Sequence, residues 1–186
     1  MIIQSNEDLL REFNSGTNFD FLYFWGHTSS KKGVGKNCLS QWYKSSFKEG
    51  LNVFNTAEQY MMYRKSIIFN DLDTAQDILN SNCPKEAKKL GRKVKGYNEN
   101  VWASLRYDIV VQGNFLKFSQ NLDLKEFLLS TGGNILVEAS PVDCIWGVGM
   151  YMDDTRISDF RMWKGSNLLG YALMKARYLI LNDDNF

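Results

Sequence analysis

Apolar residues recur at the three- and four-residue spacing of helices through most of the chain, whereas extended apolar runs are few and short. Polar residues mark helix starts: Ser5 precedes Asp8, and Thr56 precedes Gln59, in the spacing of a capping box. The pattern predicts helices over residues 5–13, 57–69, from Asp71 or Asp73 to 81, 84–91, 99–118, 122–129, and from Ser166 or Asn167 to 181.

Strand signals are confined to three places. Residues 19–25 are dense in aromatics, residues 134–139 form a short apolar run, and residues 39–47 and 51–55 flank a turn at Glu49 and Gly50. The stretches 26–37 and 141–161 are rich in loop-forming residues. Because helices outnumber strands, we predict an α+β fold that is mainly α-helical, with a small antiparallel sheet.

Length and charge narrow the choice of function. The 186 residues favour a single domain over residues 1–186, and the 44% hydrophobic content is sufficient for a substantial core. A net charge of +1 argues against binding of extended nucleic acid, which requires a basic surplus. It leaves room for a small phosphorylated ligand, which needs only one or two cations in a pocket.

The cysteine and histidine content argues against metal and disulfide sites. Cys38, Cys83 and Cys144 are far apart, and His27 is the only histidine, so we expect neither a metal site nor a disulfide framework. The N-terminal stretch turns acidic at once, and no run is long enough to cross a bilayer. These features predict a soluble, cytoplasmic protein that has no membrane partner.

The helix predicted over residues 57–69 places charged residues beside a wide apolar face. Glu58 and Lys65 are seven positions apart, about 10 Å along the axis, so they cannot pair with each other. Each therefore needs another partner or a polar pocket, because an unpaired buried charge is very costly. In the alternative interpretation, the helix dipole stabilises Glu58 and the Lys65 side chain extends to solvent.

Two further groups of residues are candidates for chemistry. An apolar strand delivers Glu138, and the turn after it delivers Asp143 beside Trp146 and two glycines, a combination suited to a sugar or nucleotide pocket. Asp143 is equally suited to cap a turn through backbone amides. The cations Arg92, Arg106 and Lys117 are each candidates for a phosphate contact or ordinary surface charges.

Several stretches in a fixed order resemble one family. They are FWGH (24–27), CLSQWY (38–43), TAEQYMMYRKSIIFND (56–71), PKEAKKLGRKV (84–94), GNFLKFSQN (113–121), LLSTGGNILVEASPVDCIWGVG (128–149) and WKGSNLLGYALMKARYLI (163–180). Together they resemble the YbiA-like, or NADAR (NAD- and ADP-ribose-associated), family over about residues 21–181. One departure is Gln59, where many members of the family have histidine.

The resemblance implies a largely helical fold around one pocket and N-glycosidase activity without a cofactor. It implies a small phosphorylated ribosyl-nucleobase-like substrate, specifically the ribosylaminopyrimidine intermediates of riboflavin biosynthesis. The alternatives are removal of ADP-ribose from guanine, in nucleotides or nucleic acid, and a non-catalytic sensor of ADP-ribose or a related nucleotide. The sequence leaves the oligomeric state open.

The implied site comprises catalytic and binding residues. Glu58 is the expected carboxylate below the sugar C1, Asp143 its partner or orienting group, and Glu138 the third choice. Lys65 opens a second route through a Schiff base, or merely holds phosphate or neutralises Glu58. The remaining residues expected to bind substrate are Trp25, Gly26, Ser40, Trp42, Arg92, Trp102, Arg106, Lys117, Trp146 and Asn167.

Overall fold

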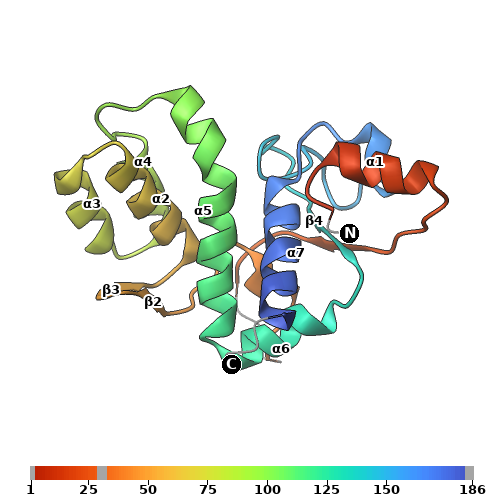
Figure 1. Cartoon of the computed structure of the whole chain (residues 1–186), viewed down its shortest axis with the longest axis horizontal. Coiled ribbons are helices and arrows are strands. Elements are labelled where there is room, and N and C mark those ends of the chain that lie inside the picture. The colour runs from red at the N-terminus through yellow and green to blue at the C-terminus, as the bar shows by residue number, and fades with distance from the viewer. Residues whose placement is uncertain (1–2, 29–32, 183–186) are drawn as a thin grey trace.

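Seven α-helices and two small strand pairs make up the computed structural model, which describes residues 3–28 and 33–182 (Figure 1). The α-helices are α1 (Asn6–Asn14), α2 (Ala57–Ile68), α3 (Leu72–Leu79), α4 (Pro84–Gly91), α5 (Glu99–Ser119), α6 (Leu122–Ser130) and α7 (Leu168–Leu181). The strands are β1 (Phe21–Phe24), β2 (Phe47–Glu49), β3 (Asn52–Phe54) and β4 (Ile135–Glu138), and short 3-10 turns span Lys36–Leu39, Thr155–Ser158 and Phe160–Met162. The mainly helical α+β class is confirmed.

Side-chain caps fix several helix starts where the sequence predicts them. Ser5 Oγ accepts a hydrogen bond from the backbone N–H of Asp8 at the start of α1, and Thr56 Oγ1 accepts one from Gln59 at the start of α2. Asp71, rather than Asp73, caps α3. These bonds satisfy amide groups that have no partner within the helix, so they set where each helix begins.

The expected small antiparallel sheet is confirmed, and a second pair of strands is parallel. β2 and β3 form an antiparallel pair, but β1 pairs in parallel with β4, with Phe21 opposite Ile135 and Phe24 opposite Glu138. The predicted strand over residues 39–47 is wrong except at its end, because residues 36–39 form a 3-10 turn whose carbonyl groups bond to a lysine of α5. Residues 29–32 of the expected 26–37 loop lie outside the described residues.

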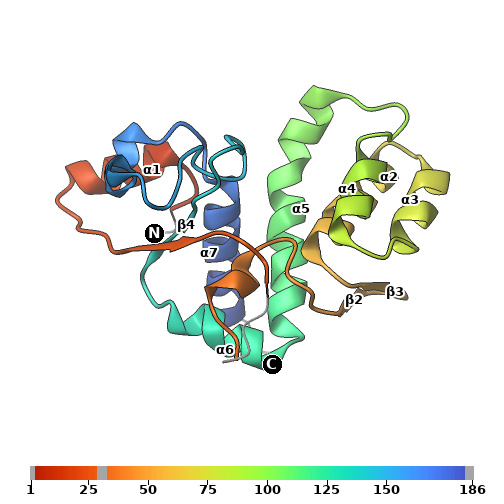
Figure 2. The same cartoon turned by 180° about the vertical axis from the view of Figure 1, so that it is seen from behind.

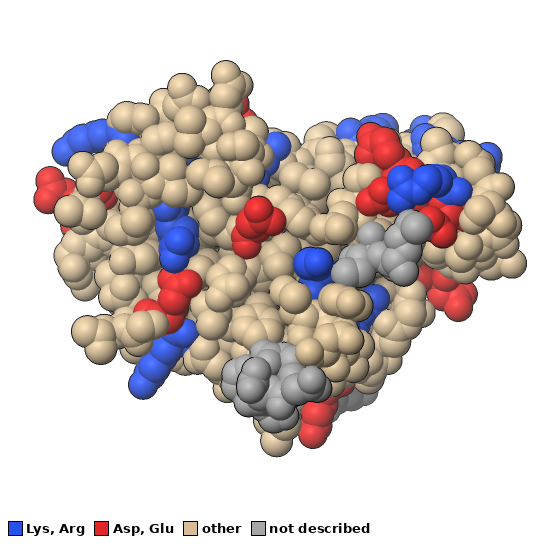
Figure 3. All heavy atoms as spheres, in the orientation of Figure 1, with Lys and Arg blue, Asp and Glu red and all other residues tan. Residues whose placement is uncertain are grey.

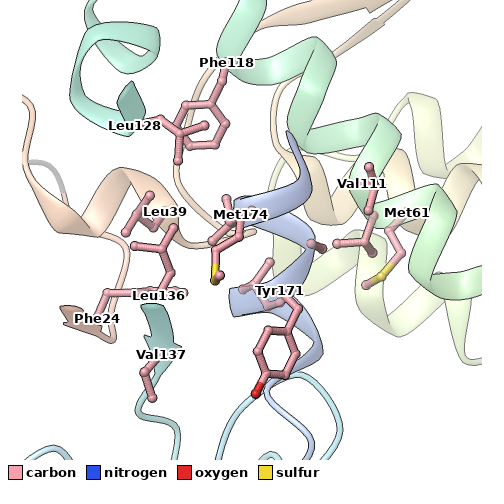
Figure 4. Packing of buried hydrophobic residues seen from close by; sticks show 14 of the residues in the cluster. Phe24, Leu39, Met61, Val111, Phe118, Leu128, Leu136, Val137, Tyr171 and Met174 are labelled. Atoms are coloured by element: carbon pink, nitrogen blue, oxygen red, sulfur yellow. The ribbon is translucent and has the colours of Figure 1, made fainter. Parts of the chain in front are cut away.

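Helices α5 and α7 pack side by side through the middle of the molecule (Figures 1 and 2). Helices α2, α3 and α4 lie beyond α5, and β1, β4 and α1 lie beyond α7. Figure 4 shows α7 contributing Tyr171 and Met174 between residues on both sides, among them Phe24, Leu39, Leu136, Val137, Met61 and Val111. One continuous hydrophobic core therefore joins the two halves.

Figure 3 shows the charged side chains on one face of the molecule. Basic and acidic side chains are scattered over the face seen in Figure 3, without a continuous basic stripe. Within residues 3–28 and 33–182, every helix is too short or too polar to span a bilayer.

Candidate active site

A cavity of about 180 Å³ lies where the two halves meet. Its walls come from the segment after the first 3-10 turn, from α2, α4 and α5, from the end of β4 with its following loop, and from the start of α7. The lining residues are Ser40, Gln41, Trp42, Glu58, Met61, Met62, Lys65, Lys88, Gly91, Arg92, Trp102, Glu138, Asp143, Trp146 and Leu169. Nine of the fourteen site residues expected from the sequence are among them.

Glu58 is a carboxyl group that is nearly sealed from water. Its side chain stands on the first turn of α2, only 3% of the residue is exposed, and Oε1 is buried without a hydrogen-bond partner. Burial raises the pKa of Glu58 to about 7, and Asp143 adds to the rise, whereas Lys88, the indole of Trp42 and Arg92 oppose it. A carboxyl group that titrates near neutrality beside a cavity is suited to proton transfer or to stabilising a developing cation.

Glu138 brings a second carboxyl group to the same cavity from the end of β4. Its Oε2 is buried without a partner, and burial, followed by the charges of Asp143 and Glu58, raises its pKa to about 8. The backbone N–H of Glu138 donates to Asn167 Oδ1, and its carbonyl oxygen accepts from Val148. These bonds fix the strand end from which the side chain enters the cavity.

Asp143 combines the two roles that the sequence leaves open. Its Oδ1 accepts hydrogen bonds from the backbone N–H groups of Ile145 and Trp146, at 2.9 and 2.8 Å, as a turn cap does. The same residue lines the cavity, and its charge raises the pKa of both glutamates. Asp143 therefore shapes the loop that presents Trp146 and also contributes negative charge to the site.

Lys65 lines the same cavity from the same face of α2, two turns after Glu58. Its Nζ donates to the carbonyl oxygen of Gly91 at 3.0 Å and lies 4.0 Å from the centre of the Tyr97 ring. Burial lowers the pKa of Lys65, with Glu99 opposing. Burial is therefore the cause of the lowered pKa, because the carbonyl oxygen and the aromatic rings around the amino group favour its charged form.

Lys88 is a cavity residue that the sequence analysis missed. It lies on α4, lines the cavity, and its Nζ is 5.8 Å from the centre of the Trp42 ring. Its positive charge lowers the pKa of both Glu58 and Glu138, against the larger effect of burial. The signal was available, because Lys88 precedes the expected Arg92 by one helical turn and therefore shares its face.

Arg92 lies at the exposed end of α4 and lines the cavity. Among the interactions of the described residues, it forms no ion pair. A guanidinium group held at a cavity rim in this way is suited to an anionic substituent of a ligand. The aromatic walls of the same cavity are Trp42, Trp102 and Trp146.

Five expected residues do not line the cavity. Trp25 and Gly26 are exposed at the end of β1, and Arg106 pairs with Glu99, its Nη1 lying 3.4 Å from Glu99 Oε1. Asn167 is fully buried at the start of α7, where its side chain bonds to the backbone of Leu136 and Glu138. Asn167 therefore joins α7 to β4, and the expectation that it contacts substrate is corrected.

Lys117 is the clearest correction among the expected phosphate contacts. The residue is fully buried, and its Nζ donates to the carbonyl oxygens of Cys38 at 2.5 Å and Ser40 at 2.9 Å. A side chain enclosed in this way cannot reach a ligand in the cavity. An apolar helix face followed by lysine does not distinguish a buried lysine from an exposed one, so the burial of Lys117 could not be predicted from its local sequence.

Gln59, which replaces the histidine common in the family, faces away from the cavity. Its side-chain amide donates to the carbonyl oxygens of Ile78 and Leu79, and its Oε1 accepts from the backbone N–H of Asn55. The residue is 2% exposed and joins α2 to the end of α3. This departure therefore concerns helix packing and leaves Glu58 unaffected.

The cavity also contains residues with no expected role: Gln41, Met61, Met62, Gly91 and Leu169. Gly91 is required where it packs against α2, because a Cβ atom there would lie 2.1 Å from the sulfur of Met62. Within the described parts of the chain, no three His, Cys, Asp or Glu side chains are grouped so as to hold a metal ion.

Known proteins are similar to this chain over most of its length. The chain is 41% identical over 160 residues to N-glycosidase R617 of Acanthamoeba polyphaga mimivirus, covering 83% of this chain and 94% of that protein. It is 36% identical over 133 residues to the chloroplastic riboflavin biosynthesis protein PYRR of Zea mays, covering 68% of this chain but 20% of that protein.

The fold has a counterpart among solved structures. The NMR structure of the Escherichia coli protein YbiA superposes with a TM-score of 0.70 at 24% identity, covering 89% of this chain and 87% of that one. Several relatives are named N-glycosidases, which supports a hydrolase acting on N-glycosyl bonds. Since the NADAR domain family model matches residues 23–181, the chain belongs to the NADAR domain family.

Proposed function

We propose that this protein hydrolyses the bond between ribose C1 and nitrogen in phosphorylated ribosylaminopyrimidines, intermediates of riboflavin biosynthesis. The observation that carries the proposal is Glu58, a buried carboxyl group with an unpaired oxygen beside a cavity that contains a second such group, Glu138. Similarity to N-glycosidases supports the reaction class, and similarity to plant riboflavin biosynthesis proteins supports the substrate class.

The reaction builds positive charge where Glu58 is placed. As the C1–N bond breaks, its electron pair goes to the nitrogen, and C1 and the ring oxygen become cationic. In the proposed mechanism, the Glu58 carboxylate stabilises this cation and takes a proton from the attacking water. The hydroxyl group of water bonds to C1, and the departing nitrogen receives a proton from an acid.

We assign that acid to Glu138 and a positioning role to Asp143. Because the pKa of Glu138 is raised to about 8, most of this group is protonated at neutral pH, as a proton donor requires. Asp143 Oδ1 already accepts two backbone hydrogen bonds, which suits an ionised group that holds the loop. This assignment reverses the order expected from the sequence, in which Asp143 preceded Glu138.

The rest of the cavity suits the other parts of such a substrate. Trp42, Trp102 and Trp146 offer aromatic surfaces for a flat pyrimidine. Arg92 at the rim offers a guanidinium group for the phosphate, and Ser40 supplies a nearby hydroxyl group. Lys88 balances part of the carboxylate charge.

Lys65 supports a second route to the same products. A ribosylamine opens to an imine at C1. The amine of Lys65, the pKa of which is lowered by burial, attacks that carbon. The pyrimidine amine leaves, and the sugar remains bound to Lys65 as a Schiff base. Water then releases the sugar and restores the lysine. Treatment with cyanoborohydride during turnover separates the routes: the Schiff-base route gives a sugar adduct on Lys65 that a Lys65→Arg variant lacks, and direct hydrolysis gives none.

Product analysis by mass spectrometry tests the proposed function. Incubation with a phosphorylated ribosylaminopyrimidine should release a phosphorylated ribose and the free aminopyrimidine. Glu58→Gln should lower turnover by at least about 100-fold while the circular dichroism spectrum is unchanged. Turnover of ADP-ribosylated guanine alone would contradict the substrate class, and tight nucleotide binding without any product would favour a sensor.

A further inference from the structure

Lys117 is a buried amine that the proposed reaction does not use. It projects from the last turn of α5 and donates to the carbonyl oxygens of Cys38 and Ser40, at 2.5 and 2.9 Å. The rings of Phe118 and Tyr43 lie 4.9 and 5.7 Å from its Nζ. Among the described residues it has no carboxylate partner, and burial lowers its pKa to about 7.

The carbonyl groups that Lys117 holds belong to the segment that forms one wall of the cavity. Ser40, Gln41 and Trp42 all line it. Lys117 bonds to the carbonyl of Ser40 itself and to that of Cys38, two residues earlier. Movement of this short stretch would therefore displace Trp42, which lines the cavity together with Glu58.

A second tie from the same face of α5 reaches the same segment. Asn114, three residues before Lys117, is fully buried, and its Nδ2 donates to Gln41 Oε1 at 3.0 Å. The carbonyl oxygen of Gln41 in turn accepts the backbone N–H of Glu58 at 3.0 Å. One side of α5 is thus connected through the 40–42 wall to the first turn of α2.

We propose that Lys117 is a positioning residue, which holds the 38–42 segment so that Trp42 is aligned against the carboxyl group of Glu58. The proposal deepens the proposed function and rests on it. Burying an amine without a carboxylate costs stability, and apolar residues often replace buried charges without loss. A bonded lysine differs from an apolar side chain in that it fixes two carbonyl oxygens in place, which is what an aligned wall requires.

The test follows the titration of Glu58, which does not depend on turnover. The signal is the NMR resonance of the Glu58 carboxyl carbon in protein labelled with ¹³C-glutamate. It is assigned as the resonance that is missing from the spectrum of Glu58→Gln. Trp42→Phe should raise the pKa of Glu58, because the indole interaction lowers it. Lys117→Met should shift that pKa in the same direction, and kcat/KM should fall by about 10- to 100-fold, the scale expected for misplaced groups.

Arg177→Met is a matched control for lost stability. Arg177 is also a buried cation without a carboxylate partner in the described structure, but it bonds to Thr131 and Asn134, away from the cavity. That variant should leave the titration of Glu58 unchanged. If Lys117→Met does not fold, Asn114→Leu, which removes the second tie, should give the same upward shift in a milder form.

The results separate the two proposals. The positioning role is overturned if Lys117→Met folds and its Glu58 titrates at the wild-type pH or at a lower pH. If Lys117→Met does not fold, the same result in Asn114→Leu overturns it. A wild-type protein that cleaves no ribosyl substrate overturns the proposed function, yet the titration of Glu58 still tests Lys117. A shift that Arg177→Met reproduces would also contradict the proposal, since it would reflect general loosening.

Discussion

Glu58 and Glu138 reach one cavity from α2 and β4, and the ionised form of Glu58 hinders the ionisation of Glu138. Burial is the larger cause of the raised pKa of each group, to about 7 and about 8. Two carboxyl groups whose pKa values differ in this way can divide the roles of base and acid near neutral pH.

The pH dependence of kcat/KM should be bell-shaped. Activity should rise as Glu58 loses its proton near pH 7 and fall as Glu138 loses its proton near pH 8. Initial rates between pH 5 and 10 in constant ionic strength check this. Glu138→Gln should remove the alkaline limb from whatever activity remains, and a rate that is flat across the neutral range would argue against both assignments.

The same pair should make the wild-type protein less stable at alkaline pH. The pKa of Glu58 is raised from the ordinary glutamate value of 4.5 to about 7. The stability that the protonated side chain contributes is therefore complete below pH 4.5 and is lost as the pH rises through about 7. Glu58→Gln cannot ionise, so at pH 9 its free energy of unfolding should exceed that of the wild type by up to about 3 kcal/mol.

Urea unfolding of Glu58→Gln and the wild type at pH 5 and pH 9 measures this difference. At pH 5 the gap should be much smaller, because the buried wild-type carboxyl group is then protonated. An equal gap at the two pH values would mean that ionisation of Glu58 is not its cause.

Lys88 should set the pH at which the site becomes active. Its charge lowers the pKa of both glutamates, so Lys88→Met should move both limbs of the pH profile upward by on the order of one pH unit. At pH 7 the rate should fall accordingly. Lys89→Met, a change at the exposed neighbouring residue of α4, is the control and should leave the profile in place.

Arg92 should contribute to binding rather than to chemistry. Arg92→Gln should raise KM for the phosphorylated substrate about 10-fold or more, the scale for loss of a charge-assisted contact, with kcat little changed. The loss of the Arg92 charge also raises the pKa of Glu58, so the two proteins are compared at their own pH optima, where they should cleave the unphosphorylated analogue about equally well. Lys93→Gln, at an exposed position next in the chain, should have no such effect.

A stability prediction concerns the start of α7. A Cβ atom at Gly170 would lie 2.0 Å from the carbonyl oxygen of Leu136 and 2.5 Å from Nδ2 of Asn167. Gly170→Ala should therefore lower the free energy of unfolding by at least about 2 kcal/mol, because α7 must move away from β4. Gly133→Ala, where the added atom meets nothing within 4 Å, should be tolerated, and thermal unfolding of both compares them.

Local signals in the sequence determined which elements form. Ser5, Thr56 and Asn98 are caps that bond to amides three residues ahead, so helix starts were predictable from short stretches. The parallel pairing of β1 with β4 was not, because it joins segments distant in the chain and depends on the packing of α7. The 3-10 turn at residues 36–39 was missed for a similar reason, since its partner, Lys117, comes from α5.

The residues that line the cavity were predictable where they stand in long matched stretches. They were less predictable where the only signal was an isolated arginine or lysine. Glu58, Glu138 and Asp143 stand in long matched stretches, and all three line the cavity. Arginine and lysine are harder, because their long side chains serve a ligand, a carboxylate or a backbone carbonyl equally well. Arg106 pairs with Glu99 and Lys117 bonds to carbonyls, and only the tertiary structure distinguishes these cases from Arg92.

The register of β1 against β4 bears on how the molecule acquires its activity. Residue 21 lies opposite residue 135, so the strand that carries Glu138 is seated only after most of the chain has been synthesised. Pairings so distant in sequence are slow steps in folding. An emerging chain that has already formed α2 therefore carries Glu58 before Glu138, Asp143 and Trp146 exist to close the cavity on their side.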